Sequence, residues 1–286
     1  MTDSTLLFHL SDIHFGLEHN RALDWVAQEI ADRRPAAVLI TGDLTMRARH
    51  REFDAARDWI LSLPVPVTVE IGNHDMPYFN PVERFFDPYK RFRGMEQVVE
   101  KELDLPGIAV VPLKTAVRAQ PRLDWSKGWI NDEALAKCLT AIDVLPAGKK
   151  VLVTAHHPLV EVGTKGTALT HGGTRALAAL AKRGITAVLT GHVHDPFDLI
   201  AETVNGPVRM IGAGTLSQRI RSTPQSFNEL RFEPDGTLTV EARNLQHVPT
   251  EAMKIDDVPE DAMPPREPGE PVAPVNAVPR VDPPVH

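Results

Sequence analysis

The sequence predicts an α/β fold, because short apolar runs alternate with amphipathic stretches through its first half. The apolar runs, which have the length of strands, are residues 6–10, 36–40 and 65–71. The stretches between them with helical periodicity are residues 21–33 and 52–63, and Pro35 and Pro64 mark their ends. This β-α-β-α-β order is typical of parallel strands joined by helices.

The second half continues with strands and helices but ends differently. The predicted strands are residues 108–113, 151–154, 185–189, 199–203, 208–212, 229–233 and 238–243, and the predicted helices are 131–145 and 171–182. The last strands follow one another closely, and Pro234-Asp235-Gly236 is a hairpin signal between two of them. We therefore expect antiparallel strands at the end of the folded part.

Aromatic residues between positions 81 and 93 have a spacing close to one helical face. They are Phe85, Phe86, Tyr89 and Phe92. This spacing predicts a helix packed on the core, in preference to a lid over a substrate. The domain is expected to span residues 1–248. Residues 249–286 are rich in proline and poor in aromatics, and such a composition predicts a disordered tail.

Composition excludes several classes of protein. The formal net charge is -7, whereas nucleic-acid-binding chains usually carry a basic excess, so no nucleic-acid partner is expected. A single cysteine, Cys138, excludes an intramolecular disulfide. No apolar run reaches the roughly 20 residues that cross a bilayer, and the N-terminus does not resemble a signal peptide. We expect a cytoplasmic protein, whose oligomeric state the sequence leaves open.

Polar motifs follow the predicted strands at the point where each strand ends. They are Asp12-Ile13-His14, Gly42-Asp43, Gly72-Asn73-His74-Asp75, His156-His157-Pro158 and Gly191-His192-Val193-His194. Loops at the carboxyl ends of strands in an open α/β sheet converge on one crevice. Residues that are distant in sequence therefore meet there. Each motif alone is more often structural than catalytic, but their conjunction favours a common site.

The converging side chains are carboxylates, an amide and imidazoles, without a thiolate. This donor set suits borderline divalent ions such as manganese, iron, zinc or cobalt. The candidate ligands are too many for one ion and suit two ions that share a bridging carboxylate. Residues at i and i+2, such as His192 and His194, can present their donors to one place.

The motif series D-x-H, GD, GNHD, H and GHxH, in this order, resembles that of the calcineurin-like metallophosphoesterase superfamily over residues 5–245. The resemblance implies a four-layer αββα sandwich of two mixed β-sheets flanked by helices. It also implies two metal sites that share Asp43. The implied ligands of one ion are Asp12, His14, Asp43 and His194, and those of the other are Asp43, Asn73, His156 and His192.

The resemblance also distinguishes the neighbouring histidines of two motifs. It implies that His156 is the ligand of its pair, although Ala155 stands where the family usually has glycine, and it leaves His157 as a possible substrate or supporting residue. It implies that His74 does not bind metal but donates a proton to the leaving group. Asp75 is a candidate to orient the His74 imidazole.

The segments HLSDIHFG, GDLT and GNHD are most similar to those of bacterial class III cyclic nucleotide phosphodiesterases. This similarity implies hydrolysis of a 3',5'-cyclic nucleotide, with cAMP as the first candidate. The alternative enzyme acts on a lipid or nucleotide-sugar-lipid ester of the UDP-diacylglucosamine type. A metal-free interaction scaffold is a third hypothesis, which the loss of a ligand would favour. All seven implied ligands are present.

Overall fold

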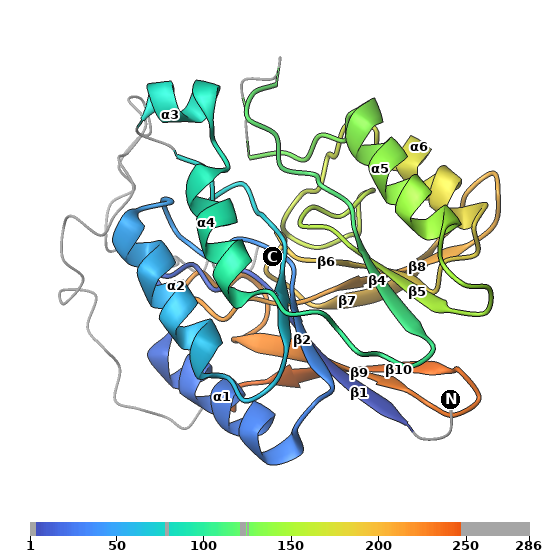
Figure 1. The fold of residues 1–286 in the computed structure, drawn as a ribbon, viewed down its shortest axis with the longest axis horizontal. Helices are drawn as coiled ribbons and strands as arrows, with labels where there is room; N and C mark the ends of the chain where they lie inside the picture. The colour runs from blue at the N-terminus through green and yellow to red at the C-terminus, as the bar shows by residue number, and fades with distance from the viewer. Residues whose placement is uncertain (1–3, 78–79, 121–123, 125, 247–286) are drawn as a thin grey trace, which may run out of the picture. The chain divides into compact units, whose positions relative to one another are not determined.

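Two five-stranded sheets, each with helices on one face, make up the computed structural model, which describes residues 4–77, 80–120, 124 and 126–246 (Figure 1). The predicted four-layer αββα arrangement is confirmed. Both sheets are mixed, as expected from parallel strands in the first half and antiparallel strands near the end.

The first sheet has the strand order β10-β9-β1-β2-β3. Its strands are β1 (Thr5–Leu10), β2 (Ala37–Ile40), β3 (Val67–Val69), β9 (Ser226–Phe232) and β10 (Leu238–Asn244). Strands β1, β2 and β3 are parallel, whereas β9 pairs antiparallel with β1 and with β10. The predicted hairpin joins β9 to β10, where the backbone N–H of Gly236 donates to the carbonyl of Glu233 at 2.8 Å.

The second sheet has the order β4-β5-β6-β8-β7. Its strands are β4 (Ile108–Pro112), β5 (Lys150–Thr154), β6 (Ala187–Thr190), β7 (Phe197–Ala201) and β8 (Val208–Gly212). Only β7, at one edge, runs antiparallel to its neighbour β8. Because β4, β5, β6 and β8 are parallel, their carboxyl ends all lie at the same end of this sheet.

Alternate side chains of the central strands build two different core layers, as the pleat of a strand requires. On β2, Val38 and Ile40 pack in the cluster that includes α1 (Asn20–Arg33), α2 (His50–Ser62) and α4 (Lys90–Val99). Ala37 and Leu39 point the other way and pack against residues of the second sheet. Helices α5 (Asp132–Asp143) and α6 (Gly173–Ala181) cover the outer face of that second sheet.

The prediction of one core-packed helix through residues 81–93 was wrong about its continuity but right that Tyr89 and Phe92 pack on the core. The chain forms α3 (Pro81–Phe86) and then α4, with a break at Asp87 before Pro88. Proline disfavours helical backbone in the residue that precedes it, and Asp87 has φ -151° and ψ 72°. The aromatics are consequently divided: Phe92 is 4% exposed, whereas Phe86 is 84% exposed.

The predicted disordered tail, residues 249–286, lies outside the described residues, and its structure stays a prediction. Cys138 is a buried free thiol within α5, and burial raises its pKa to about 12. Among the described helices, none combines the length and the apolar character that crossing a bilayer requires.

Glu70, which follows β3, provides a test of the fold by its effect on stability. Burial raises the pKa of its carboxyl from 4.5 to about 8, against a hydrogen bond of 2.6 Å from the Thr154 hydroxyl. Between these two pH values the folded chain keeps a proton that the unfolded chain has released. Stability therefore falls as pH rises through this window.

We predict that Glu70→Gln raises the free energy of unfolding at pH 8 by at least about 1 kcal/mol and has little effect at pH 4.5. The glutamine oxygen can still accept the Thr154 hydrogen bond. Urea unfolding at several pH values measures this difference. A difference between the two proteins that does not change with pH would contradict the raised pKa of this carboxyl.

Candidate metal centre

The candidate ligands are carried by the loops that follow parallel strands of both sheets. Asp12 and His14 follow β1, Asp43 follows β2, and Asn73 follows β3 in the first sheet. In the second sheet His156 follows β5, and His192 and His194 follow β6. The site is therefore assembled where the carboxyl edges of two sheets meet, rather than within one sheet.

Most of these ligands have an unusual backbone conformation. The φ angles of Asp12, His14, Asp43, His192 and His194 lie between 52° and 69°, in the left-handed region. A non-glycine residue is uncommon there, and such strain concentrates at functional sites. The left-handed turns allow alternate residues of a loop, such as Asp12 and His14, to direct their side chains into the same small volume.

Two glycines are required by close contacts between the ligand loops. A Cβ atom on Gly191 would lie 1.7 Å from the Ser11 hydroxyl oxygen and 2.5 Å from Oδ2 of Asp12. A Cβ atom on Gly72 would lie 2.0 Å from Oδ1 of Asp43. The glycines that precede the ligands therefore permit loops from different strands to approach one another.

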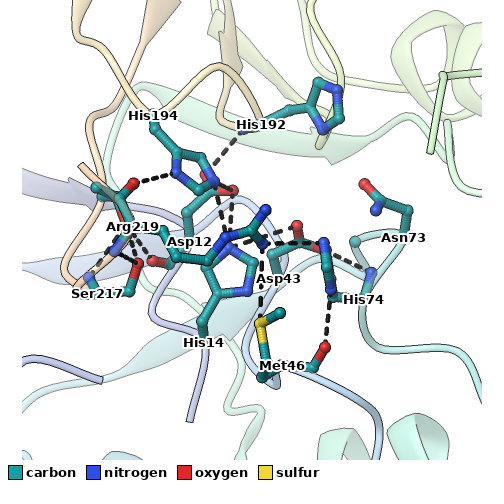
Figure 2. A network of polar contacts seen from close by, with 12 residues as sticks. Asp12, His14, Asp43, Met46, Asn73, His74, His192, His194, Ser217 and Arg219 are labelled. Carbon is teal, nitrogen blue, oxygen red and sulfur yellow. Dashed lines mark hydrogen bonds and ion pairs between the residues drawn. The ribbon is translucent and has the colours of Figure 1, made fainter. Parts of the chain in front are cut away.

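One group of ligands gathers around Asp12. Its carboxylate oxygen Oδ1 lies 3.1 Å from Nε2 of His194 and 3.7 Å from Nε2 of His14. The two imidazole Nε2 atoms are 3.2 Å apart. Figure 2 shows the side chains of Asp12, His14 and His194 converging from two loops.

A second group lies on the other side of Asp43. Oδ2 of Asp43 is 3.3 Å from Nε2 of His156 and 3.8 Å from Nε2 of His14, so this carboxylate faces both groups. Oδ1 of Asn73 is 3.2 Å from Nε2 of His156. The ring of His192 packs edge-on to that of His156 and points away from His14 and His194 (Figure 2).

Backbone carbonyls fix the orientation of two of these imidazoles. Nδ1 of His194 donates to the carbonyl of Arg219 at 2.6 Å, and Nδ1 of His156 donates to the carbonyl of Thr41 at 2.8 Å. When the proton of each ring is on Nδ1, Nε2 presents its lone pair to the centre. This arrangement is the usual support of a metal-binding histidine.

Burial and neighbouring charges set the protonation of the centre. Burial alone would raise the pKa of both carboxyls, but His194 holds the pKa of Asp12 below its usual range, and His156 does the same for Asp43. Burial lowers the pKa of His14 and of His192 well below 6.5. The carboxylates are thus ionised and these two imidazoles neutral, which is the state that binds cations. Against the effect of burial, the Asp43 carboxylate raises the pKa of His156 to about 9, so a cation must displace a proton from this ring.

The residues present fit a metal centre. Oδ1 of Asp12 is buried and has no hydrogen-bond partner among the described residues. A buried polar atom without a partner is costly, and several acceptors converge here with few donors between them. A cation resolves this imbalance. The groups of ligand atoms within 4.8 Å of one another include Asp12, His14 and His194, and also Asp12, Asp43 and His156.

His157 lies near the second group but is fully engaged by the protein. Its Nε2 donates to the carbonyl of Ser126 at 2.8 Å, and its Nδ1 is 2.9 Å from the Thr115 hydroxyl oxygen. Burial lowers its pKa to about 3. This geometry favours His156 as the ligand and leaves His157 a supporting role beneath the site.

His74 lies beside the ligands, with its ring edge-on to that of His14. Its Nδ1 donates to the carbonyl of Met46 at 2.8 Å. The hypothesis that Asp75 orients this imidazole was wrong. Asp75 instead accepts hydrogen bonds from the backbone N–H groups of Leu44, Thr45 and Gly72, because its carboxylate is buried under the loops. It thereby ties the Asp43 loop to the Asn73 loop.

Sequence reasoning missed Arg219, which follows β8. Its carbonyl orients His194, and its guanidinium Nη1 donates to Nε2 of His74 at 3.1 Å. Strand β8 is parallel to β6, so its carboxyl end faces the same edge as the ligand loops. Loops at the carboxyl ends of parallel strands converge, and this rule, applied to β8, indicates the loop that carries Arg219.

Fold and ligand set together define a metal-binding protein built on a two-sheet α/β sandwich. The model of the calcineurin-like phosphoesterase family (Metallophos) matches residues 6–196. The chain belongs to this family, and the resemblance inferred from the motifs is confirmed.

Curated relatives carry two kinds of name. A probable glycerophosphodiester phosphodiesterase GpdQ of Arcobacter nitrofigilis is 28% identical over 56% of this chain and 57% of its own length, which is less than two thirds. A probable cyclic nucleotide phosphodiesterase of Synechococcus is 24% identical over 73% of this chain and 76% of its own. A probable cyclic nucleotide phosphodiesterase of Rhodopseudomonas palustris is 26% identical over 54% and 58%.

Solved structures with the same fold include a dimetal phosphatase from Danio rerio, with a TM-score of 0.60 and 14% identity over 84% of this chain and 96% of that one. A purple acid phosphatase from yellow lupin has a TM-score of 0.55 and 12% identity over 85% of this chain and 52% of that one. At these identities the likeness shows the fold alone.

The close approach of the ligand loops predicts the effect of adding one methyl group. Gly191→Ala places that group against Ser11 and Asp12, so we expect a loss of about 1–3 kcal/mol in the free energy of unfolding and a lower metal content than wild type. Metal analysis after reconstitution with manganese measures the second effect.

Gly94→Ala is the matched control, because a Cβ atom at this position in α4 meets nothing within 4 Å. This variant should keep its metal and gain roughly 0.5–1 kcal/mol of stability. Equal metal contents in both variants would refute the proposed packing of the ligand loops.

Proposed function

We propose that the protein is a metal-dependent phosphodiesterase and that a 3',5'-cyclic nucleotide, with cAMP as the first candidate, is its substrate. The observation that carries this proposal is the geometry of Asp43, which faces two groups of ligands while His74 lies beside them. Such a constellation suits the attack of an oxygen nucleophile on phosphorus followed by departure of an alcohol.

Two divalent ions, which we propose to be manganese or iron with zinc or cobalt as alternatives, would supply a hydroxide near neutral pH and neutralise phosphoryl charge. Asp12, His14, Asp43 and His194 would hold one, and Asp43, Asn73, His156 and His192 the other. The protein itself supplies a rigid frame for these ligands. The hydrogen bonds of His156 and His194 to backbone carbonyls orient their rings before anything binds.

His74 is the candidate for the general acid. Its Nδ1 proton is used in the hydrogen bond to the Met46 carbonyl, so the proton for the leaving oxygen must be carried on Nε2. Nε2 is directed toward the centre and accepts from Arg219 in this structure. Protonation of the departing alkoxide by a positioned imidazole typically contributes 10²–10⁴-fold to the rate.

The names of the relatives support a diester substrate and differ on which one. The Synechococcus relative, which covers 73% of this chain, is named a probable cyclic nucleotide phosphodiesterase. The names of the Arcobacter relative and of an Enterobacter lignolyticus relative favour a glycerophosphodiester as the second candidate. Phe85 and Phe86 on α3 are exposed and could contact a lipid chain, so a lipid-linked ester is the third candidate.

The test is a comparison of substrates with the manganese-loaded protein before and after chelation. We expect chelator-sensitive hydrolysis of cAMP and of bis-p-nitrophenyl phosphate. Hydrolysis of glycerophosphocholine with cAMP left intact would replace the first candidate by the second. Absence of turnover on every diester by protein that has bound two ions would refute the proposed function.

We predict that His74→Ala reduces kcat for esters with poor leaving groups by about 10²–10⁴-fold. Esters of p-nitrophenol should lose much less, because their leaving group departs without protonation. Steady-state kinetics on a series of aryl and alkyl diesters gives this comparison. An equal loss across the series would remove the acid role from His74.

A further inference from the structure

The side chain of Arg219 reaches from the loop after β8 into the centre, where its guanidinium lies beside His74 (Figure 2). Nη1 is 3.1 Å from Nε2 of His74 and 3.8 Å from Sδ of Met46. Both partners are uncharged acceptors in this arrangement. The side chain is partly buried, and no role in holding metal can be assigned to it because a guanidinium has no lone pair to offer.

Arg219 differs in this respect from other arginines of the chain. Arg209 pairs with Asp198 at 2.6 Å, and Arg183 pairs with Asp143 at 2.7 Å. Among the described residues, no carboxylate lies within ion-pair distance of Arg219. A partly buried cation whose partners are a ring nitrogen and a thioether keeps most of its capacity to bind an anion.

The charge of the occupied centre strengthens this capacity. Two divalent ions would exceed the charge of the two carboxylates, Asp12 and Asp43, and Arg219 adds another positive charge beside them. A cation in this position is unfavourable unless an anion lies between it and the ions. A phosphate group is the anion that this centre is proposed to receive.

We infer that Arg219 is a substrate-binding residue that donates to the non-bridging oxygens of the phosphate. The inference rests on the proposed function and extends it. In the free protein the guanidinium occupies Nε2 of His74. When a phosphate binds, the guanidinium moves to the phosphoryl oxygens and frees Nε2 of His74. Nε2 can then take up a proton from solvent water and pass that proton to the departing oxygen.

The backbone of Arg219 has a separate function that makes the side chain testable. Its carbonyl accepts from Nδ1 of His194, and its N–H donates to the Ser217 hydroxyl oxygen at 3.2 Å. Neither contact depends on the guanidinium. A substitution that removes the charge therefore leaves the support of His194 in place, and metal content is expected to stay at the wild-type level.

The first experiment measures binding of inorganic phosphate to manganese-loaded protein by titration calorimetry. Arg219→Gln should weaken phosphate affinity by roughly tenfold to a hundredfold, the usual effect of one charged hydrogen bond. Arg219→Lys should recover part of the loss. Arg221→Gln, which removes an exposed arginine two positions away, is the matched control and should bind as wild type does.

The same comparison is then made in a His74→Ala background. If Arg219 contacts phosphate, Arg219→Gln weakens binding there too. If it acts only by holding His74, the second substitution has no further effect, and the inference is overturned. Unchanged phosphate affinity in Arg219→Gln with full metal content overturns it as well.

Kinetics separate this inference from the proposed function. A wild-type protein that hydrolyses diesters together with an Arg219→Gln variant of unchanged kcat/KM refutes the role of Arg219 alone. A wild-type protein that binds metal and phosphate without hydrolysing any diester refutes the proposed function, while the calorimetric comparison still decides whether Arg219 binds the anion.

Discussion

Contact between the two sheets at their carboxyl edges is the constraint on which the site depends. The backbone N–H of His192, from the second sheet, donates to Oδ2 of Asp12, from the first, at 2.8 Å. His156, also from the second sheet, donates to the carbonyl of Thr41 in the first at 2.8 Å. Each proposed metal site thus draws ligands from both sheets. The layer between the sheets, which includes fully buried Leu39 and Leu189, sets the distance between them.

The charge of two buried carboxylates is the second constraint on the site. Asp12 and Asp43 are buried carboxylates that stay ionised because imidazoles lie against them. An isolated buried charge is costly, so these carboxylates need positive charge beside them, which a protonated imidazole or a bound cation can supply. Left-handed turns at most of the ligands direct these side chains inward, and the backbone strain is held by the surrounding hydrogen bonds. A bound cation would therefore relieve repulsion between these two carboxylates.

Much of this arrangement could be predicted from the sequence, because its signals are local. Strands and helices were located by periodicity, and the motifs after strands β1, β2, β3, β5 and β6 were brought together by the rule of converging strand ends. The conformations of the loops were not predictable in this way. Asp12 and His194 adopt left-handed backbone, which non-glycine residues rarely do, and no pattern in the sequence indicates it.

Three other features depend on long-range packing or on a competing local signal. Asp75 bonds to loop backbone 30 residues or more away in Leu44 and Thr45, rather than to the neighbouring His74 ring. The aromatic spacing predicted one continuous helix, but the chain breaks at Asp87, the residue before Pro88. Arg219 has no motif of its own, and its guanidinium meets His74 only because β8 lies next to β6 in the folded sheet.

Anomalous scattering from crystals grown with manganese tests the shared-carboxylate centre directly. Two peaks are expected, both within bonding distance of the Asp43 carboxylate, with His14 and His194 at one and His156 and His192 at the other. A single peak, or two peaks that do not share Asp43, would contradict the shared-carboxylate centre from which the proposed chemistry follows.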